Sequence, residues 1–194
     1  MPKKIDHDSY RKELATKAAS LFSEYGYTGL GMRKIASELG ISKSALYHYF
    51  PTKQALFHAC TDIVTRFDED SQSDSLMETM REAPLEQRVQ VLMSIIKEME
   101  PSFPSEMSLL LDYLRGRTKQ DIADDPTMQL ANKRYDALFE QFFDKEDAKP
   151  VYCLMLGTLL LRFFDGGTTE FDEIEDWLLE NLKEKVVYKK ATLE

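Results

Sequence analysis

The stretch GISKSALYHYFPTK, residues 40–53, carries the signals of one short helix with a defined start and end. Gly40 can adopt the left-handed conformation that ends a preceding helix, and Ser42 suits the N-cap of the next one. Pro51 disfavours helical backbone at the residue before it. The sequence therefore predicts a helix over residues 43–50, joined to an earlier helix by a short turn.

The predicted helix has two different faces. At 100° per residue, Leu46 and Phe50 fall on one side, and Tyr49 lies near that apolar edge, where its ring can pack while its hydroxyl stays exposed. The opposite side is polar, hydrogen-bonding and positively charged, and it consists of Lys43, Ser44, Tyr47 and His48. Such a face can contact base edges and phosphates in DNA.

The flanking sequence also predicts helices. An apolar stripe at helical spacing runs through residues 14–25 and is closed by Gly26, and a shorter helix is expected over residues 32–39. Thr52 can cap a further helix that begins at Lys53. Two short helices joined at residues 40–42 have the layout of a helix-turn-helix, whose second helix enters the major groove in DNA-binding proteins.

Residues 10–67 resemble the DNA-binding domain of TetR-type (tetracycline-repressor-like) transcriptional regulators. The similarity is carried by AASLFSEYGYTGLGMRKIASELGISKSALYHYFPTKQALF, residues 18–57. The resemblance implies an all-α protein with a DNA-binding domain at residues 8–68, its helix-turn-helix motif at 31–50, and a helical effector-binding and dimerisation domain at 69–194. Members of that family are usually homodimeric repressors that bind a palindromic operator and are released by a small molecule.

The resemblance also assigns DNA-binding roles to individual positions. Lys43, Ser44 and Ala45 match the base-reading start of the recognition helix, and Lys53 matches a lysine that grips a backbone phosphate. Gly31 departs from the pattern, because the family usually has Ser or Thr there to open the second helix. The full set of implied DNA contacts is Thr28, Arg33, Lys43, Ser44, Ala45, Tyr47, His48, Tyr49 and Lys53.

The two parts of the chain differ in charge. The total is −9, but residues 1–66 hold 10 Lys and Arg against 6 Asp and Glu, while residues 67–194 hold 15 against 28. A mildly basic front on an acidic body indicates different partners for the two parts, with the body lying away from DNA. In the body, the patterns predict helices near residues 76–82, 85–99, 104–117, 126–143, 150–165 and 171–187.

The last two of these helices are candidates for a dimer interface. Residues 151–164 are apolar on nearly all faces, Gly157 permits close approach of another helix, and Trp177 belongs to an apolar stripe in the final helix. The resemblance implies that the helices near 150–165 and 171–187 form a four-helix bundle with a second copy. The alternative is that both helices are internal core.

Met and aromatic side chains on the middle helices can line an adaptable ligand pocket. The alternative at these spacings is plain core. Glu100 is among four acidic residues that could face a cationic ligand or belong to a solvated surface. The candidate effector-binding residues are Met93, Phe103, Met107, Tyr113, Tyr135 and Phe139.

Other classes of function have little support in the sequence. No catalytic or phosphate-binding motif and no metal-ligand spacing is present, so we expect no enzyme activity, no cofactor and no metal. Two widely separated cysteines, the absence of a signal peptide and an apolar run too short to span a bilayer favour a soluble cytoplasmic protein. The remaining alternative is an acidic helical adaptor that binds another protein.

Overall fold

The structure, a computed structural model, describes residues 6–66, 80 and 82–191, with backbone only for 184–191, and every regular element in these ranges is a helix. The described residues up to 66 pack with residues 105–134 as one compact unit, and residues 80–104 pack with 135–191 as a second. The expected domain boundary at residues 68–69 lies outside the described residues and stays a prediction. Residues 105–134, which follow that boundary in the sequence, pack with the N-terminal helices.

The first unit begins with α1 (His7–Tyr25), α2 (Met32–Glu38), α3 (Lys43–Tyr49) and α4 (Lys53–Val64). The predicted caps are confirmed: Ser42 accepts a hydrogen bond from the Ala45 amide at 3.1 Å, and Thr52 accepts one from Ala55 at 3.0 Å. Gly40 has φ +68°, as its helix-ending role requires. α3 stops one residue early, because Phe50, which precedes the proline, is extended.

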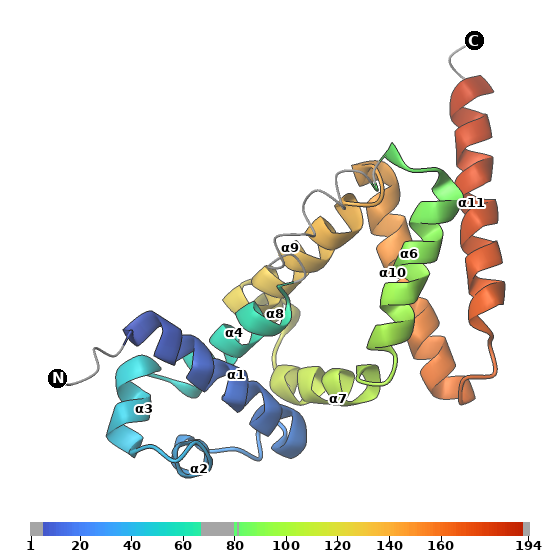
Figure 1. The fold of residues 1–194 in the computed structure, drawn as a ribbon. Helices are drawn as coiled ribbons and strands as arrows, with labels where there is room; N and C mark the ends of the chain where they lie inside the picture. Colours follow the sequence, from blue (N-terminus) through green and yellow to red (C-terminus); the bar gives the residue numbers. More distant parts are fainter. Residues whose placement is uncertain (1–5, 67–79, 81, 192–194) are drawn as a thin grey trace. The chain divides into compact units, whose positions relative to one another are not determined.

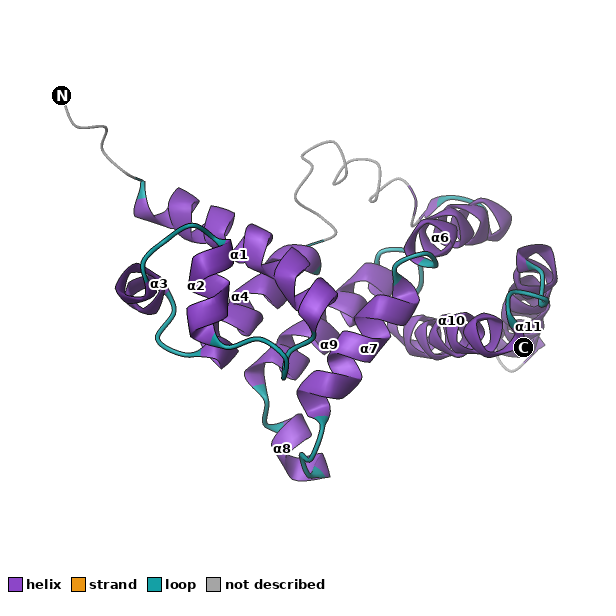
Figure 2. Ribbon diagram, turned by 90° about the horizontal axis from the view of Figure 1, so that it is seen from below, coloured by secondary structure: helices purple, strands orange, loops and turns teal. Residues whose placement is uncertain are grey.

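The core of the first unit fixes the orientation of α3. α1 packs along α4 and α2 packs on α3 (Figures 1 and 2). Leu46 and Phe50 are fully buried, as the helical wheel predicted. α7 (Phe103–Leu114) supplies Tyr113, whose ring centroid lies 4.4 Å from that of Phe57 on α4. The polar face of α3 is left outward as a result.

The helix predicted over residues 104–117 is α7, which ends three residues earlier than expected, and a short helix that the sequence did not predict follows it. α7 ends at Leu114, Gly116 takes φ +76°, and α8 (Lys119–Ala123) follows with a capping box between Thr118 and Asp121. α8 was missed because the apolar stripe stops before it. α9 (Pro126–Glu140) then begins at the predicted residue but ends three residues earlier than expected.

Asp125 caps α9 and also joins three other segments of the first unit. Its Oδ1 accepts the amides of Thr127 (2.8 Å) and Met128 (3.1 Å). Its Oδ2 accepts hydrogen bonds from Tyr113 Oη at 2.7 Å, Arg117 Nη1 at 2.5 Å and Gln54 Nε2 at 3.1 Å. One buried carboxylate therefore ties α4, α7 and α9 together.

The second unit is built on α6 (Leu85–Met99), α10 (Lys145–Asp165) and α11 (Phe171–Ala191), which lie side by side (Figures 1 and 2). α10 begins five residues before the predicted start at Pro150, which is tolerated in its second turn. Gly166, with φ +70°, ends α10 as predicted. The helix expected near 76–82 falls almost entirely outside the described residues.

Candidate DNA-binding surface

The outward face of α3 is exposed as a group. Lys43, Ser44, Tyr47 and His48 are all solvent-exposed, and 40% of the Tyr47 surface is accessible. The Lys43 ammonium lies 5.5 Å from the centroid of the Tyr47 ring. The face therefore combines a cation, a hydroxyl, an imidazole and a phenol over two turns, which suits contacts to phosphates and base edges.

Tyr49 supports this face from its edge. Its ring is half-buried and meets the Tyr10 ring edge-on at 5.4 Å. Its hydroxyl, expected to be exposed, lies 2.9 Å from Nδ1 of His7. This pair ties the start of α1 to the end of α3, and His48 packs its ring edge-on against Tyr49 at 5.2 Å.

The other predicted contacts at the two ends of the motif are placed as follows. Arg33 is exposed on the first turn of α2. Ala45 is half-buried, and its amide is used by the Ser42 cap, while the Ser44 hydroxyl lies 3.0 Å from that of Ser42. Gly31 opens α2 without a side-chain cap, in line with the departure seen in the sequence.

Lys53 is oriented toward the protein. Its Nζ donates to the carbonyl oxygens of Tyr27 at 2.9 Å and Leu30 at 3.0 Å, and it lies 4.1 Å from the Tyr27 ring centroid. Burial lowers the pKa of Lys53, and the nearby Asp112 carboxylate opposes that shift. The lysine thus anchors the α1–α2 loop, and one of its three N–H groups remains for a phosphate.

Thr28 is held by a residue that the sequence did not single out for this purpose. Its amide donates to Oδ2 of Asp112 at 2.7 Å, and its hydroxyl lies 2.8 and 2.9 Å from the two carboxylate oxygens. These hydrogen bonds lower the pKa of Asp112. Gly26 makes room for the carboxylate, since a Cβ there would lie 3.1 Å from Oδ2. The donors of Thr28 are therefore engaged within the protein.

The six candidate effector-binding residues are divided between the two units, and their role stays a prediction. Tyr113 is buried in the core of the first unit, and Met107 is half-buried in that unit too. In the second unit, Tyr135 stacks on Tyr152 with centroids 5.6 Å apart, and Phe139 lies 5.0 Å from the same ring. Met93 is core, and Phe103 lines a cavity.

α10 presents an exposed apolar stripe on the second unit. Leu161 and Phe164 are 45% and 76% accessible, and Gly157 and Cys153, one and two turns before Leu161, are exposed on the same face. On α11, Trp177 is 44% accessible. Large apolar side chains that are exposed together on one helix face are typical of a protein–protein interface.

Within the described ranges, no helix is long and apolar enough to cross a bilayer, and no group of His, Cys, Asp and Glu side chains forms a metal site.

Comparison with known proteins shows which proteins the chain is similar to. Residues 14–60 match the profile of the bacterial regulatory proteins of the tetR family. The transcriptional regulator PksA of Bacillus subtilis is 28% identical, with 94% of this chain and 93% of PksA aligned. The transcriptional repressor AcnR of Corynebacterium efficiens is 33% identical over 37% of this chain and 38% of AcnR.

Solved structures show the same fold at lower sequence identity. The multidrug binding protein EbrR, complexed with imidazole, matches with a TM-score of 0.64 at 18% identity, over 88% of this chain and 93% of EbrR. NalD of Pseudomonas aeruginosa, the secondary repressor of the MexAB-OprM multidrug efflux pump, matches with a TM-score of 0.57 at 18% identity, over 92% and 96% of the two chains.

Proposed function

We propose that the chain, whose residues 14–60 match the profile of the tetR family of bacterial regulatory proteins, is a transcriptional repressor of that family and binds a palindromic DNA operator as a homodimer. The observation that carries the proposal is the outward face of α3, where Lys43, Tyr47 and His48 are exposed together on a helix fixed by a buried opposite side. A helix of this kind fits the major groove.

The DNA-contacting residues divide by role. Lys43, Ser44 and Tyr47, at the start and middle of α3, would meet base edges in the major groove. Arg33 and His48 would meet the phosphates on either side. Lys53 would offer one N–H to a phosphate while it anchors the loop before α2. Ala45 and Tyr49 would act through close packing at the edge of the contact.

Dimerisation follows from the same geometry. Two recognition helices must lie about one turn of duplex apart, roughly 34 Å, to read the two halves of a palindrome. The stripe of Cys153, Gly157, Leu161 and Phe164 on α10 offers an apolar surface for a second copy. The glycine supports this use, because helices approach closely where a side chain is absent.

The proposed repressor is released when a small molecule binds the helical second unit. The support is the match to the tetR family profile, the acidic composition of residues 67–194, and a cavity within the second unit. A ligand that binds the DNA-free conformation more tightly than the DNA-bound one shifts the population of the protein away from the operator. Such a ligand would release the repressor.

Selection of bound fragments from the source genome, followed by fluorescence anisotropy over a range of salt concentrations, tests the proposal. We expect the logarithm of the DNA-binding constant to fall linearly with the logarithm of the salt concentration. Tyr47→Ala should change sequence preference, and Arg33→Ala should lower the salt slope by about one on every sequence. Lys119→Ala on α8 is the control for loss of one charge. An adaptor protein would ignore duplex DNA at every salt concentration.

A further inference from the structure

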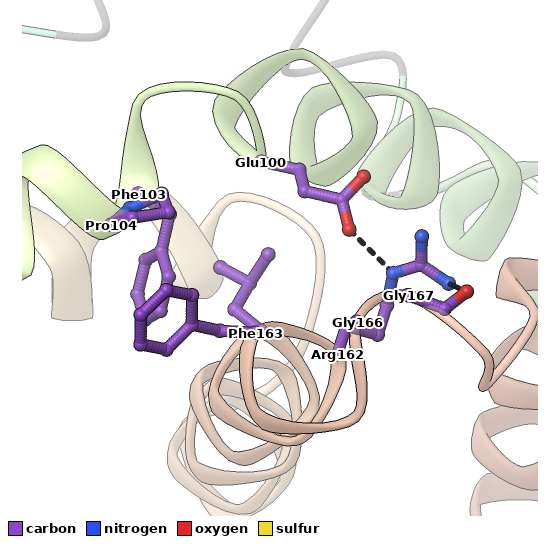
Figure 3. Close-up of a pocket in the computed structure, with 8 residues that line it drawn as sticks. Glu100, Phe103, Pro104, Arg162, Phe163, Gly166 and Gly167 are labelled. Atoms are coloured by element: carbon purple, nitrogen blue, oxygen red, sulfur yellow. Dashed lines mark hydrogen bonds and ion pairs between the residues drawn. The ribbon is translucent and has the colours of Figure 1, made fainter.

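The second unit contains a cavity of about 360 Å³ where the end of α6, the start of α7 and the C-terminal end of α10 meet (Figure 3). This volume lies within the range of small-molecule sites, roughly 300–1,000 Å³. One side is an ion pair and the other is aromatic. The side chains that define it are Glu100, Phe103, Pro104, Leu159, Arg162 and Phe163.

Arg162 is already committed within the protein. Its Nε donates to Oε1 of Glu100 at 2.5 Å, and its Nη1 donates to the carbonyl oxygens of Thr169 and Gly167. The guanidinium carbon also lies 4.0 Å from the centroid of the Phe171 ring, and only 10% of the side chain is accessible. An anionic ligand would have to break this arrangement and would meet the Glu100 carboxylate.

Glu100 is the polar group that the cavity offers to a ligand. Its side chain is 34% accessible, and among the described residues its hydrogen bond goes to Arg162 through one oxygen. A carboxylate has about four acceptor positions, so it can take further N–H donors. Figure 3 shows this carboxylate across the cavity from the rings of Phe103 and Phe163.

The rings select for the same ligands as the carboxylate. The faces of aromatic rings carry negative potential, so they favour stacking with flat rings and attract cations. The −13 charge of residues 67–194 adds a long-range preference for cations over anions. The free acceptor positions of Glu100, the aromatic rings and the net charge therefore all favour a flat, positively charged molecule with N–H donors.

We propose that this cavity binds a small aromatic cation, with an N–H group donating to Glu100 and the ring packed against Phe103 and Phe163. The proposal rests on the proposed function in that it identifies the site and chemical class of the effector. Arg162 serves as a positioning residue, because its bonds to the loop after α10 hold the Glu100 carboxylate at the cavity edge.

The test uses two ligands of the same shape and opposite charge, 2-naphthamidinium and 2-naphthoate, titrated by calorimetry into the DNA-free protein. We expect saturable binding of the amidinium and at least about tenfold weaker binding of the naphthoate, since a charge-assisted hydrogen bond is worth this factor or more. Equal binding of both ligands, or no binding of the amidinium at millimolar concentration, would overturn the proposal.

Two charge-removing variants locate the site. Glu100→Gln should weaken amidinium binding by about tenfold, while Glu98→Gln, two residues earlier and exposed, should leave it within about twofold. Equal loss in both variants would mean that only the general acidity of the body matters. If Glu100→Gln does not fold, the comparison of the two ligands on the unaltered protein still tests the proposal. Operator binding is measured separately, so failure of the ligand site leaves the DNA result standing.

Discussion

At the scale of single residues, the contact between Asp112 and Thr28 changes what a threonine near the DNA-binding face is expected to do. The resemblance suggested a phosphate contact, but both donors of Thr28 are bonded to the carboxylate. Lys53 also donates hydrogen bonds to the carbonyls of Tyr27 and Leu30 in the same loop. The segment that precedes α2 is therefore fixed by both Asp112 and Lys53. The expected role of Thr28 is therefore to position α2.

Thr28→Val and Asp112→Asn should each weaken operator binding by about fivefold, and the double variant should be no weaker than either one, since the two residues act as one unit. The slope of log affinity against log salt should stay at its unaltered value, because no phosphate contact is removed. Thr16→Val on α1, where the hydroxyl donates to the Lys12 carbonyl within the same helix, is the control. A slope lowered by about one in Thr28→Val would restore the phosphate role.

Asp125 gives a prediction about pH. Burial alone would raise its pKa, but hydrogen bonds from Tyr113, Met128 and Arg117 outweigh burial and hold the pKa below its ordinary value. A lowered pKa means that the folded state binds fewer protons than the unfolded one. The stabilisation is therefore complete above the unfolded pKa, near 4, and is lost as the pH falls through the lower folded value.

Asp125→Asn should reduce the free energy of unfolding at pH 7 by roughly 3 kcal/mol, because it leaves the partly buried Arg117 without its charge partner. The difference from the unaltered protein should shrink below about pH 4. Urea denaturation at pH 7 and pH 3 measures both values. Asp124→Asn, at an exposed neighbouring position, should change little at either pH. A difference that is constant with pH would count against this account.

At the scale of elements, two glycines that flank α2 have opposite requirements. Gly40 has φ +68°, where any other residue is strained, whereas Gly31 has φ −100° and open space on the side where a Cβ would lie. Gly31 also leaves the start of α2 without a side-chain cap. The same kind of substitution should therefore change stability in opposite directions at the two ends of one helix.

Gly31→Ser should raise the free energy of unfolding by about 0.5–1 kcal/mol, by restricting the unfolded chain and supplying a cap. Gly40→Ala should lower it by about 1 kcal/mol. Chemical denaturation of the two variants and the unaltered protein checks the signs. A loss of stability in Gly31→Ser would show that the loop before α2 does not accept a side chain.

The sequence was a good guide where a signal is local. The caps at Ser42 and Thr52, the glycine stops at Gly26 and Gly40, and the split of α3 into a buried and an exposed face are all confirmed. Local signals failed at α8, which has no apolar stripe, and at the start of α10, where a proline in the second turn was taken for a boundary.

Contacts between distant parts of the sequence could not be predicted at all. Asp112 and Thr28 are 84 positions apart, and Glu100 and Arg162 are 62 apart. Neither pair has a spacing or motif that links its members. The predicted effector residues have the same weakness, since Met and aromatic side chains at helical spacing do not indicate whether they face a cavity or the core.

At the scale of the whole molecule, the proposed homodimer can be followed through its two cysteines. Cys60 is buried, its thiol donates to the Ala15 carbonyl, and burial raises its pKa to about 12. Cys153 is exposed on the α10 stripe in the single chain. Only a thiolate within reach of the reagent reacts, so Cys60 should stay unreactive in any folded form, whereas the reactivity of Cys153 should depend on whether a partner covers the stripe.

We therefore expect Cys153 to react with a disulfide reagent such as DTNB at least about tenfold more slowly in the dimer than in Leu161→Glu, because a charge on the stripe opposes burial against a second apolar surface. Dilution of the unaltered protein should raise the rate toward that of the variant, as mass action requires. Val64→Glu, at another exposed apolar position outside α10, should leave the rate unchanged. A Cys153 that reacts equally fast in all three proteins, together with a monomer by sedimentation, would contradict the α10 interface and remove the geometric basis for reading a palindrome.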